Sequence, residues 1–353
     1  MPAWQPIYRP FNVVSSFIGF GLLSIAIGVF MLITTLKTNE IVHDYTKCKW
    51  IANNSLTCAD VIERRLLKQN NQRCKCEVKI EIMENMATPV YLYYNLDGFY
   101  QNHRRYVTSV DYNQLLGKDV SHSTLRSNCE PYAINGSDFS YAPCGAIANS
   151  FFTDKFTLFY GSSEIKIKNT DIAWNSDKRN RYKNPPNGWS GTTKPVNWSL
   201  SVQELDESNP DNNGYQNEHL IVWMRTAAFA DFRKLWGRVE PSIWRDDSFL
   251  PKGSYRIIIE YNYPTVIGKM NIPKKLILSN TSWLGGRNLF LPILYLIVGG
   301  LCIVFGLIFL LIVWKVPNSK KVNVMKTVQA NYNTMSPPSA DVQFAHNPMF
   351  EAD

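Results

Sequence analysis

The sequence predicts a two-span membrane protein, in which a large antiparallel β-sandwich, jelly-roll-like and with short helices, lies between two transmembrane helices. Two long apolar runs, residues 13–36 and 290–313, contain no charged residue. Each is long enough to cross the hydrocarbon core of a bilayer as a helix. The region between the runs is rich in β-branched and aromatic segments. Because a span precedes it and a span follows it, we expect this region to form one large domain on one side of a membrane.

The first apolar run could be mistaken for a cleaved signal peptide. Its apolar stretch is too long for one, and no small-x-small cleavage pattern follows before Lys37. We interpret it as a permanent signal anchor. The last segment is polar and has too few apolar residues to fold alone, so we expect it to be disordered. We predict a cytosolic N-terminal segment at 1–12, a first span at 13–36 and a disulfide-bonded glycosylated domain at 37–289. A second span at 290–313 and a cytosolic tail at 314–353 follow.

Glycosylation sequons and cysteines predict which side the middle domain faces. All four Asn-x-Ser/Thr sequons and six of the seven cysteines lie between the apolar runs. Together they indicate an oxidising, glycosylating compartment. We therefore expect the domain to be lumenal or extracellular, both termini to be cytosolic, and sugars to attach at Asn53, Asn135, Asn197 and Asn280.

The middle domain carries strand signals bounded by Gly, Pro and Asn. Helical patches are short, which argues against parallel sheets with helical crossovers and favours an antiparallel sandwich. We expect helical patches at 59–67 and 227–236 and a loop-rich stretch at 184–195. The predicted strands are 76–82, 90–96, 156–160, 220–224, 255–263 and 275–278.

The six cysteines of the domain permit 15 disulfide pairings. Cys74 and Cys76 are too close to bridge each other comfortably, so we expect them to pair outward to Cys48 and Cys58. Cys129 and Cys144 would then close their own loop. Zinc is a weaker interpretation of the Cys74-Lys-Cys76 pair, because metal ligands usually have a wider spacing and the compartment is oxidising.

No enzyme motif is found: the sequence has no zinc-protease helix, no nucleophile elbow and no phosphate-binding P-loop. Residues 209–214 copy the first half of a calcium loop, but Leu220 stands where a bidentate carboxylate is required, so a turn is the better interpretation. Arg104 and Arg105 could bind phosphate or an acidic partner, although a solvated strand edge is the commoner explanation for such a pair. The net charge of +8 is spread over a large domain and indicates no nucleic-acid partner.

The two spans contain no ionisable residue of the kind found in intramembrane transport sites. Two spans also cannot enclose a transport path alone. Small residues at Ser15, Gly19, Ser24 and Gly28 in the first span, and at Gly299, Gly300 and Gly306 in the second, would let another helix approach closely.

Several motifs resemble one family, the non-catalytic β-subunits of lipid flippases known as the cell-division-cycle-fifty or transmembrane-protein-thirty family. They run in the same order along nearly the whole chain before the tail. The motifs are PAWQPI at 2–7, FYQNHRRY at 99–106, CGAIANS at 144–150, GTTKPVNW at 191–198, IVWMRTAA at 221–228 followed by FRKL at 232–235, and SWLGGRN at 282–288.

The resemblance implies a heterodimer with a type IV P-type ATPase, which would hold the phosphorylated aspartate, the ATP site and the lipid path. This chain would then be a chaperone and β-subunit, without cofactors, that travels from the endoplasmic reticulum to the Golgi, endosomes or plasma membrane. The transported lipid would be an aminophospholipid such as phosphatidylserine or phosphatidylethanolamine. The family's pairing would join Cys48 to Cys76, Cys58 to Cys74, and Cys129 to Cys144.

Two other protein classes share part of this pattern. Trimeric ligand-gated cation channels also have two spans and a disulfide-rich ectodomain, but a polar residue normally lines their second span, and this chain has none. A lumenal enzyme anchored at both ends would need a catalytic group that the motif search does not find.

Overall fold

The computed structural model describes residues 10–64, 73–240, 243–244, 247–268 and 270–315. The chain separates into two units, one containing residues 1–33 and 289–353 and the other containing residues 34–288. The PAWQPI motif at 2–7 and residues 316–353 of the predicted tail lie outside the described residues. The first two residues of that predicted tail, 314 and 315, belong to the second long helix.

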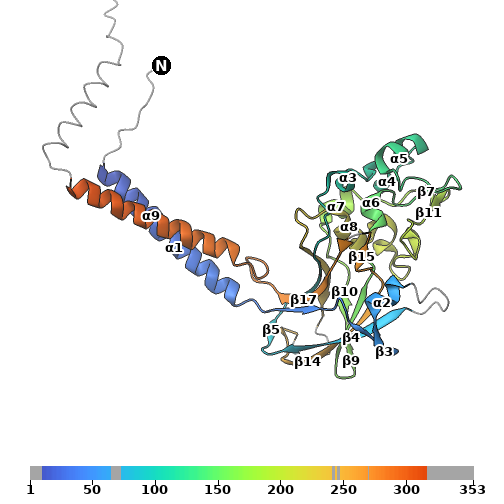
Figure 1. The fold of residues 1–353 in the computed structure, drawn as a ribbon, viewed down its shortest axis with the longest axis horizontal. Helices are drawn as coiled ribbons and strands as arrows, with labels where there is room; N and C mark the ends of the chain where they lie inside the picture. Colours follow the sequence, from blue (N-terminus) through green and yellow to red (C-terminus); the bar gives the residue numbers. More distant parts are fainter. Residues whose placement is uncertain (1–9, 65–72, 241–242, 245–246, 269, 316–353) are drawn as a thin grey trace, which may run out of the picture. The chain divides into compact units, whose positions relative to one another are not determined.

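The first unit is built on two long helices, α1 (Pro10–Leu36) and α9 (Phe290–Lys315). Both are long and apolar enough to span a membrane. They lie side by side (Figure 1), and Gly21 faces Gly299 across their contact. A Cβ added to Gly21 would lie 2.9 Å from the Gly299 carbonyl oxygen and 2.8 Å from Ile303 Cγ1. A larger residue at this crossing would push the helices apart.

The small faces that we predicted for helix packing divide into two sets. Gly28 of α1 faces α9, and Gly299 and Gly306 of α9 face α1. Gly19 and Gly300 have no atom within 4 Å of the position that a Cβ would take. The α1–α9 contact therefore uses the first set and leaves the second open.

The second unit is built on two large antiparallel sheets. The five-stranded sheet runs in the order β1 (Glu40–Asp44), β17 (Lys274–Asn280), β6 (Val90–Leu96), β12 (Phe232–Val239) and β10 (Ile167–Lys168). The six-stranded sheet runs in the order β3 (Asn53–Thr57), β2 (Lys49–Trp50), β4 (Cys74–Ile82), β14 (Gly253–Tyr261), β8 (Lys155–Tyr160) and β9 (Ser163–Ile165).

One hydrophobic core joins the two sheets. Strand β4 alternates buried and exposed residues along its whole length, which is the pattern of a sheet with one face on a core. Its neighbour β14 pairs with it from Gly253 opposite Ile82 to Tyr261 opposite Cys74. Residues of β4 and β14 share this core with Leu92 of β6 and Leu276 of β17. The structure thus confirms the predicted class, two apolar helices and an antiparallel β-rich domain.

Short elements complete the domain, and Figure 1 shows most of the short helices gathered on the side away from β9 and β14. The small ribbons are β7 (Ser140–Tyr141) parallel to β11 (Thr192–Thr193), β5 (Met86–Ala87) with β13 (Phe249–Leu250), and β15 (Val266–Ile267) with β16 (Met270–Asn271). The helices are α2 (Cys58–Glu63), α3 (Arg104–Val107), α4 (Tyr112–Leu115), α5 (His122–Cys129), α6 (Ala146–Asn149), α7 (Asn175–Asn180) and α8 (Glu218–Met224), with 3₁₀ turns η1 (Val202–Glu204), η2 (Pro210–Asn212) and η3 (Gly214–Gln216).

Two predicted elements were wrong in type. Residues 220–224, predicted as a strand, form helix α8, where Asn217 caps the N-terminus by accepting a hydrogen bond from Leu220 N at 3.1 Å. The helix is buried nearly all round, so its short apolar run carries no period that would distinguish it from a strand. Most of residues 227–236, predicted as helical, lie in the loop before β12 and in β12 itself, which pairs with β6 on one side and β10 on the other. The alanine residues at the start of this segment favour a helix, but pairing with the neighbouring strands determines its structure.

Candidate partner-binding surface

Two disulfides join β4 to the start of α2, at Cys58, and to Cys48, the residue directly before β2. Cys74 and Cys76 are two residues apart on β4, so both point to the same buried face. Cys76 is joined to Cys48 with a Cα–Cα distance of 6.0 Å, and Cys74 is joined to Cys58 at 5.7 Å. The edge of the six-stranded sheet is thereby fixed at two adjacent points.

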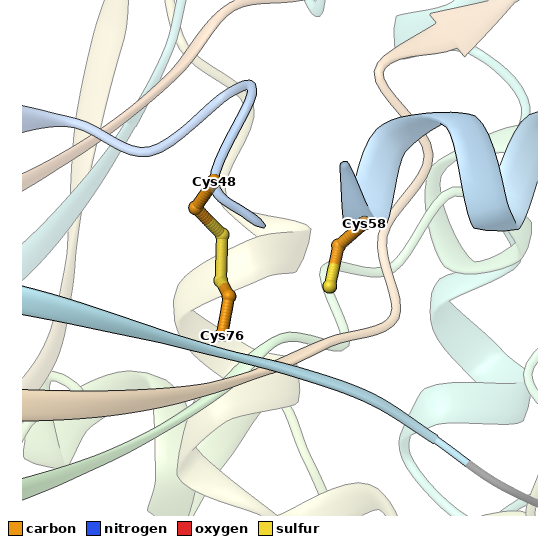
Figure 2. A group of neighbouring side chains, drawn as sticks. All are labelled: Cys48, Cys58 and Cys76. Carbon is orange, nitrogen blue, oxygen red and sulfur yellow. A yellow bond between two sulfur atoms is a disulfide. The ribbon is translucent and has the colours of Figure 1, made fainter. Parts of the chain in front are cut away.

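The sulfur atoms of Cys48, Cys58 and Cys76 lie within 4.8 Å of one another, a grouping that resembles a metal site. Figure 2 shows that Cys48 and Cys76 are bonded to each other with Cys58 beside them. Cys58 is itself bonded to Cys74. Metal ligation requires a thiolate, and a sulfur in a disulfide offers none. The grouping is therefore explained by two neighbouring bridges.

The third disulfide joins Cys129, at the end of α5, to Cys144 with a Cα–Cα distance of 5.8 Å. These two cysteines, Leu125 and Ala133 form a small core of their own, separate from the main core. The bridge therefore supports a part of the domain that has few other apolar contacts.

The predicted glycosylation residues differ in their surroundings. Asn53 and Asn197 are exposed, and Asn135 is half-buried in a turn where its Oδ1 accepts hydrogen bonds from Ser137 N and Phe139 N. Asn280 is only 6% exposed, and its Oδ1 accepts a hydrogen bond from Asn39 N at 2.8 Å. Sugar attachment at Asn280 would have to disturb the end of β17, so we expect the other three to carry the glycans.

A surface of arginine and aromatic residues is assembled from two loops that are distant in sequence, residues 97–103 and 225–231. Asn102 Nδ2 donates a hydrogen bond to Ala228 O at 2.8 Å. Ala227 N donates to Gln101 Oε1 at 2.9 Å, and Phe99 N donates to Ala230 O at 3.2 Å. These bonds hold the loops side by side.

The loops are anchored from beneath by buried polar groups. Gln101 is fully buried, and its Nε2 donates to Tyr106 Oη at 3.3 Å. Tyr106 Oη is in turn 2.8 Å from Ser150 Oγ. Burial raises the pKa of Tyr106 to about 12, so its hydroxyl stays protonated at physiological pH. The hydrogen bonds among Gln101, Tyr106 and Ser150 therefore hold the first loop in place.

Lys234 on β12 supports the second loop. Its ammonium donates three hydrogen bonds at the end of α8, to the carbonyl oxygens of Val222 at 2.9 Å, Trp223 at 2.9 Å and Arg225 at 2.6 Å. Helix ends leave carbonyl groups without partners, and a cation there satisfies them. Burial and then Arg225 lower the pKa of Lys234 to about 7.

Large apolar side chains are exposed on the two loops and directly before α7. Phe229 is 77% exposed, Trp174 is 66% exposed and Tyr100 is 57% exposed. We define the arginine–aromatic surface as these three residues with His103, Arg104, Arg105 and Arg225. The Arg225 guanidinium lies 5.5 Å from the centre of the Trp174 ring, which joins α7 to the two loops.

The charges on this surface are only partly neutralised. Arg225 pairs with Asp177 at 3.2 Å, but Arg104 and Arg105 have no ion pair among the described residues. Both lie on helix α3, not at the strand edge that we considered for them. Exposed aromatic groups beside arginine are the composition of protein-binding hot spots.

The calcium-like segment lies in a pair of short turns. Residues 209–214 form the 3₁₀ turns η2 and η3, in line with the predicted turn. Asn212 Oδ1 accepts a hydrogen bond from Glu218 N, and Asn213 Oδ1 accepts from Gly214 N. Of the side chains at the ligand positions of a calcium loop, Asn213 thus uses its Oδ1 to accept hydrogen bonds from the backbone N–H groups of Asp206 and Gly214.

Comparison with known proteins places the chain in a family. Residues 31–319 match the LEM3 (ligand-effect modulator 3) family / CDC50 family. The chain belongs to this family. It is 40% identical over 334 residues to mouse (Mus musculus) "Cell cycle control protein 50A", covering 90% of this chain and 88% of the relative. It is 38% identical over 325 residues to human (Homo sapiens) "Cell cycle control protein 50B", covering 88% and 90%.

A plant relative carries a more explicit name. "Putative ALA-interacting subunit 4" of Arabidopsis thaliana is 35% identical over 313 residues, covering 88% of this chain and 85% of the relative. Membership of the CDC50 family thus agrees with the resemblance that the motifs had indicated.

Proposed function

We propose that this chain is the non-catalytic accessory β-subunit of a phospholipid flippase whose catalytic subunit is a type IV P-type ATPase. The observation that carries the proposal is the CDC50 family match, which extends over residues 31–319. One relative is named as an interacting subunit, which supports a role in binding another protein. The resemblance of the motifs supplies the class of that partner.

In this proposal the partner hydrolyses ATP and moves an aminophospholipid to the cytosolic leaflet. The present chain binds it, is needed for its folding and for its exit from the endoplasmic reticulum, and stays bound afterwards. A subunit that binds one conformation of a pump better than another shifts the population between them. This chain can therefore influence the transport cycle without taking part in the chemistry.

The proposed orientation puts the β-rich domain in the lumen or outside the cell and both ends of the chain in the cytosol. The disulfides and sequons support it, since both belong to oxidising, glycosylating compartments. The complex would move from the endoplasmic reticulum toward the Golgi, endosomes or plasma membrane.

We assign the arginine–aromatic surface to the contact with the ATPase. Its exposed rings offer apolar area, and Arg104 and Arg105 offer charges that acidic groups on a partner would neutralise. The open small residues Gly19 and Gly300 leave room for a helix of the same partner within the membrane.

The proposal is tested by purifying the tagged full chain from its own cells in mild detergent and identifying the bound proteins by mass spectrometry. We expect a stoichiometric P-type ATPase of the type IV class. Recovery of a homotrimer without an ATPase would favour a channel subunit, and recovery of the chain alone would contradict a stable heterodimer.

A further inference from the structure

A cavity of about 840 Å³ opens between the two sheets of the β-rich domain. Phe156 of β8 and Glu260 of β14 line it from one sheet, and Trp236 of β12 lines it from the other. Residues 197–200 form part of its wall. Its volume lies within the range of small-molecule sites, about 300–1,000 Å³.

The cavity wall combines aromatic faces with polar side chains that make no hydrogen bond to any residue the structure describes. Phe151 and Trp236 are half-buried, and the ring of Trp198 is fixed by a hydrogen bond from its Nε1 to Ala148 O at 2.7 Å. The side chains of Lys155, Thr157, Asn169 and Ser199 line the cavity and make no hydrogen bond within the described part of the chain. Sugars suit such a wall, because their hydroxyls bind polar groups while their C–H faces pack on the electron-rich faces of aromatic rings.

Asn197, a predicted glycosylation residue, lies at this cavity. It is the acceptor of the sequon Asn197-Trp198-Ser199, it lines the cavity and it is exposed. Its backbone is held by a hydrogen bond from Asn197 N to Asn149 Oδ1 at 3.0 Å, but its side-chain amide has no hydrogen bond within the described residues. The amide nitrogen is therefore free to carry a glycan. Asn53 and Asn135 do not line this cavity.

We propose that the N-linked glycan on Asn197 folds back into the cavity, so that its first sugars pack between Trp236 and the polar wall. The glycan would then fill space between the sheets and be part of the folded domain. This inference rests on the lumenal orientation proposed above, because only a domain in that compartment receives N-linked sugars.

The test compares how fast each glycan is released from the folded protein. The full chain is expressed in cells that attach N-linked sugars, purified in mild detergent and treated with peptide N-glycosidase F in ¹⁸O water. Peptide mass spectrometry then gives the release rate at each sequon. We expect release at Asn197 to be at least about tenfold slower than at Asn53 and Asn135, which corresponds to about 1.4 kcal/mol of protection. After denaturation the three rates should become equal.

A double variant, Asn169→Ala with Thr157→Val, removes two polar groups from the cavity wall. It should accelerate release at Asn197 and leave release at Asn53 unchanged. Asn180→Ala is the matched control, because Asn180 is exposed at the end of α7 and does not line the cavity. Unchanged thermal midpoints show that both variants are folded.

The outcomes separate this inference from the proposed function. Sugar at Asn53 and Asn135, with Asn197 bare or released as fast as they are, overturns the inference and leaves the lumenal orientation intact. A chain without sugar at any sequon would overturn the orientation itself.

Discussion

Lys274 and Asp154 form an ion pair in which both side chains are completely buried, with Lys274 Nζ 2.7 Å from Asp154 Oδ2. Lys274 begins β17 of the five-stranded sheet, and Asp154 directly precedes β8 of the six-stranded sheet. The pair therefore connects the two sheets through the core. Tyr45 Oη also donates to Asp154 Oδ2 at 3.0 Å, and Lys274 Nζ donates to Tyr263 O at 2.7 Å. Asp154 Oδ1 accepts from Asn262 N and Tyr263 N, each at 2.6 Å.

Replacing Asp154 by Asn should destabilise the domain strongly, because it leaves the Lys274 ammonium buried without its counter-charge. Removing one partner of a buried pair costs about 3–5 kcal/mol. Thermal unfolding of the full chain in detergent, followed by tryptophan fluorescence, measures the loss. Lys275→Met is the matched control, since Lys275 is a partly exposed neighbour whose contact with Asp97 is 3.8 Å long and is worth at most about 1 kcal/mol. Equal losses for the two variants would show that the buried pair has no special role.

Lys234 should make stability depend on pH. Its folded-state pKa is lowered from 10.5 to about 7, so between these values the unfolded chain binds the proton and the folded chain does not. Stability contributed at this site therefore rises as pH increases above about 7, and the dependence vanishes below it. Thermal midpoints between pH 6 and 9 should rise more steeply for the wild type than for Lys234→Met. The exposed Lys166→Met should keep the wild-type slope, and parallel curves for all three would contradict the prediction.

The bridge between Cys129 and Cys144 should support both stability and export. Its ends are 15 residues apart, and a loop of this size is worth about 3 kcal/mol in the chain-entropy account. A Cys129→Ser, Cys144→Ser variant should lose about that much stability and reach the cell surface less often. Cys302→Ser is the control, because Cys302 is a free cysteine in α9. Unchanged delivery and sugar processing in the double variant would argue against a structural role for the bridge.

The arginine–aromatic surface should bind the partner. Introducing charge with Phe229→Glu or Tyr100→Glu should lower recovery of the ATPase with the tagged chain by at least about tenfold, the effect of losing a hot-spot residue. Thermal midpoints should not change, since both side chains are mostly exposed. Phe139→Glu provides the control, because Phe139 is an exposed aromatic outside the surface. Equal recovery with all three variants would place the contact elsewhere.

The sequence predicted elements whose pattern is local. The alternation of β4 and the length and composition of α1 and α9 are visible in the residues themselves. Helix α8 was misread because its apolar run is too short to show a period, and β12 because its identity depends on pairing with β6. In both cases the type of element is set by contacts with other parts of the chain, which the residues of the element alone do not reveal.

The arginine–aromatic surface could be predicted only in part. Arg104 and Arg105 stood out as a pair of cations, whereas Phe229 and Trp174 carry no local signal of exposure. Their position follows from hydrogen bonds between residues more than a hundred positions apart, such as that from Asn102 to Ala228. Lys234 gave no signal either, because only the fold places it under the end of α8.

The central claim is that an ATPase of the type IV class needs this chain in order to work. The most direct measurement is ATP hydrolysis by the copurified ATPase in liposomes with and without phosphatidylserine, prepared from cells that contain or lack this chain. The account predicts lipid-stimulated hydrolysis only from cells that contain the chain, and little ATPase leaving the endoplasmic reticulum without it. Equal export and equal lipid-stimulated hydrolysis in both preparations, with no related subunit present, would contradict the account.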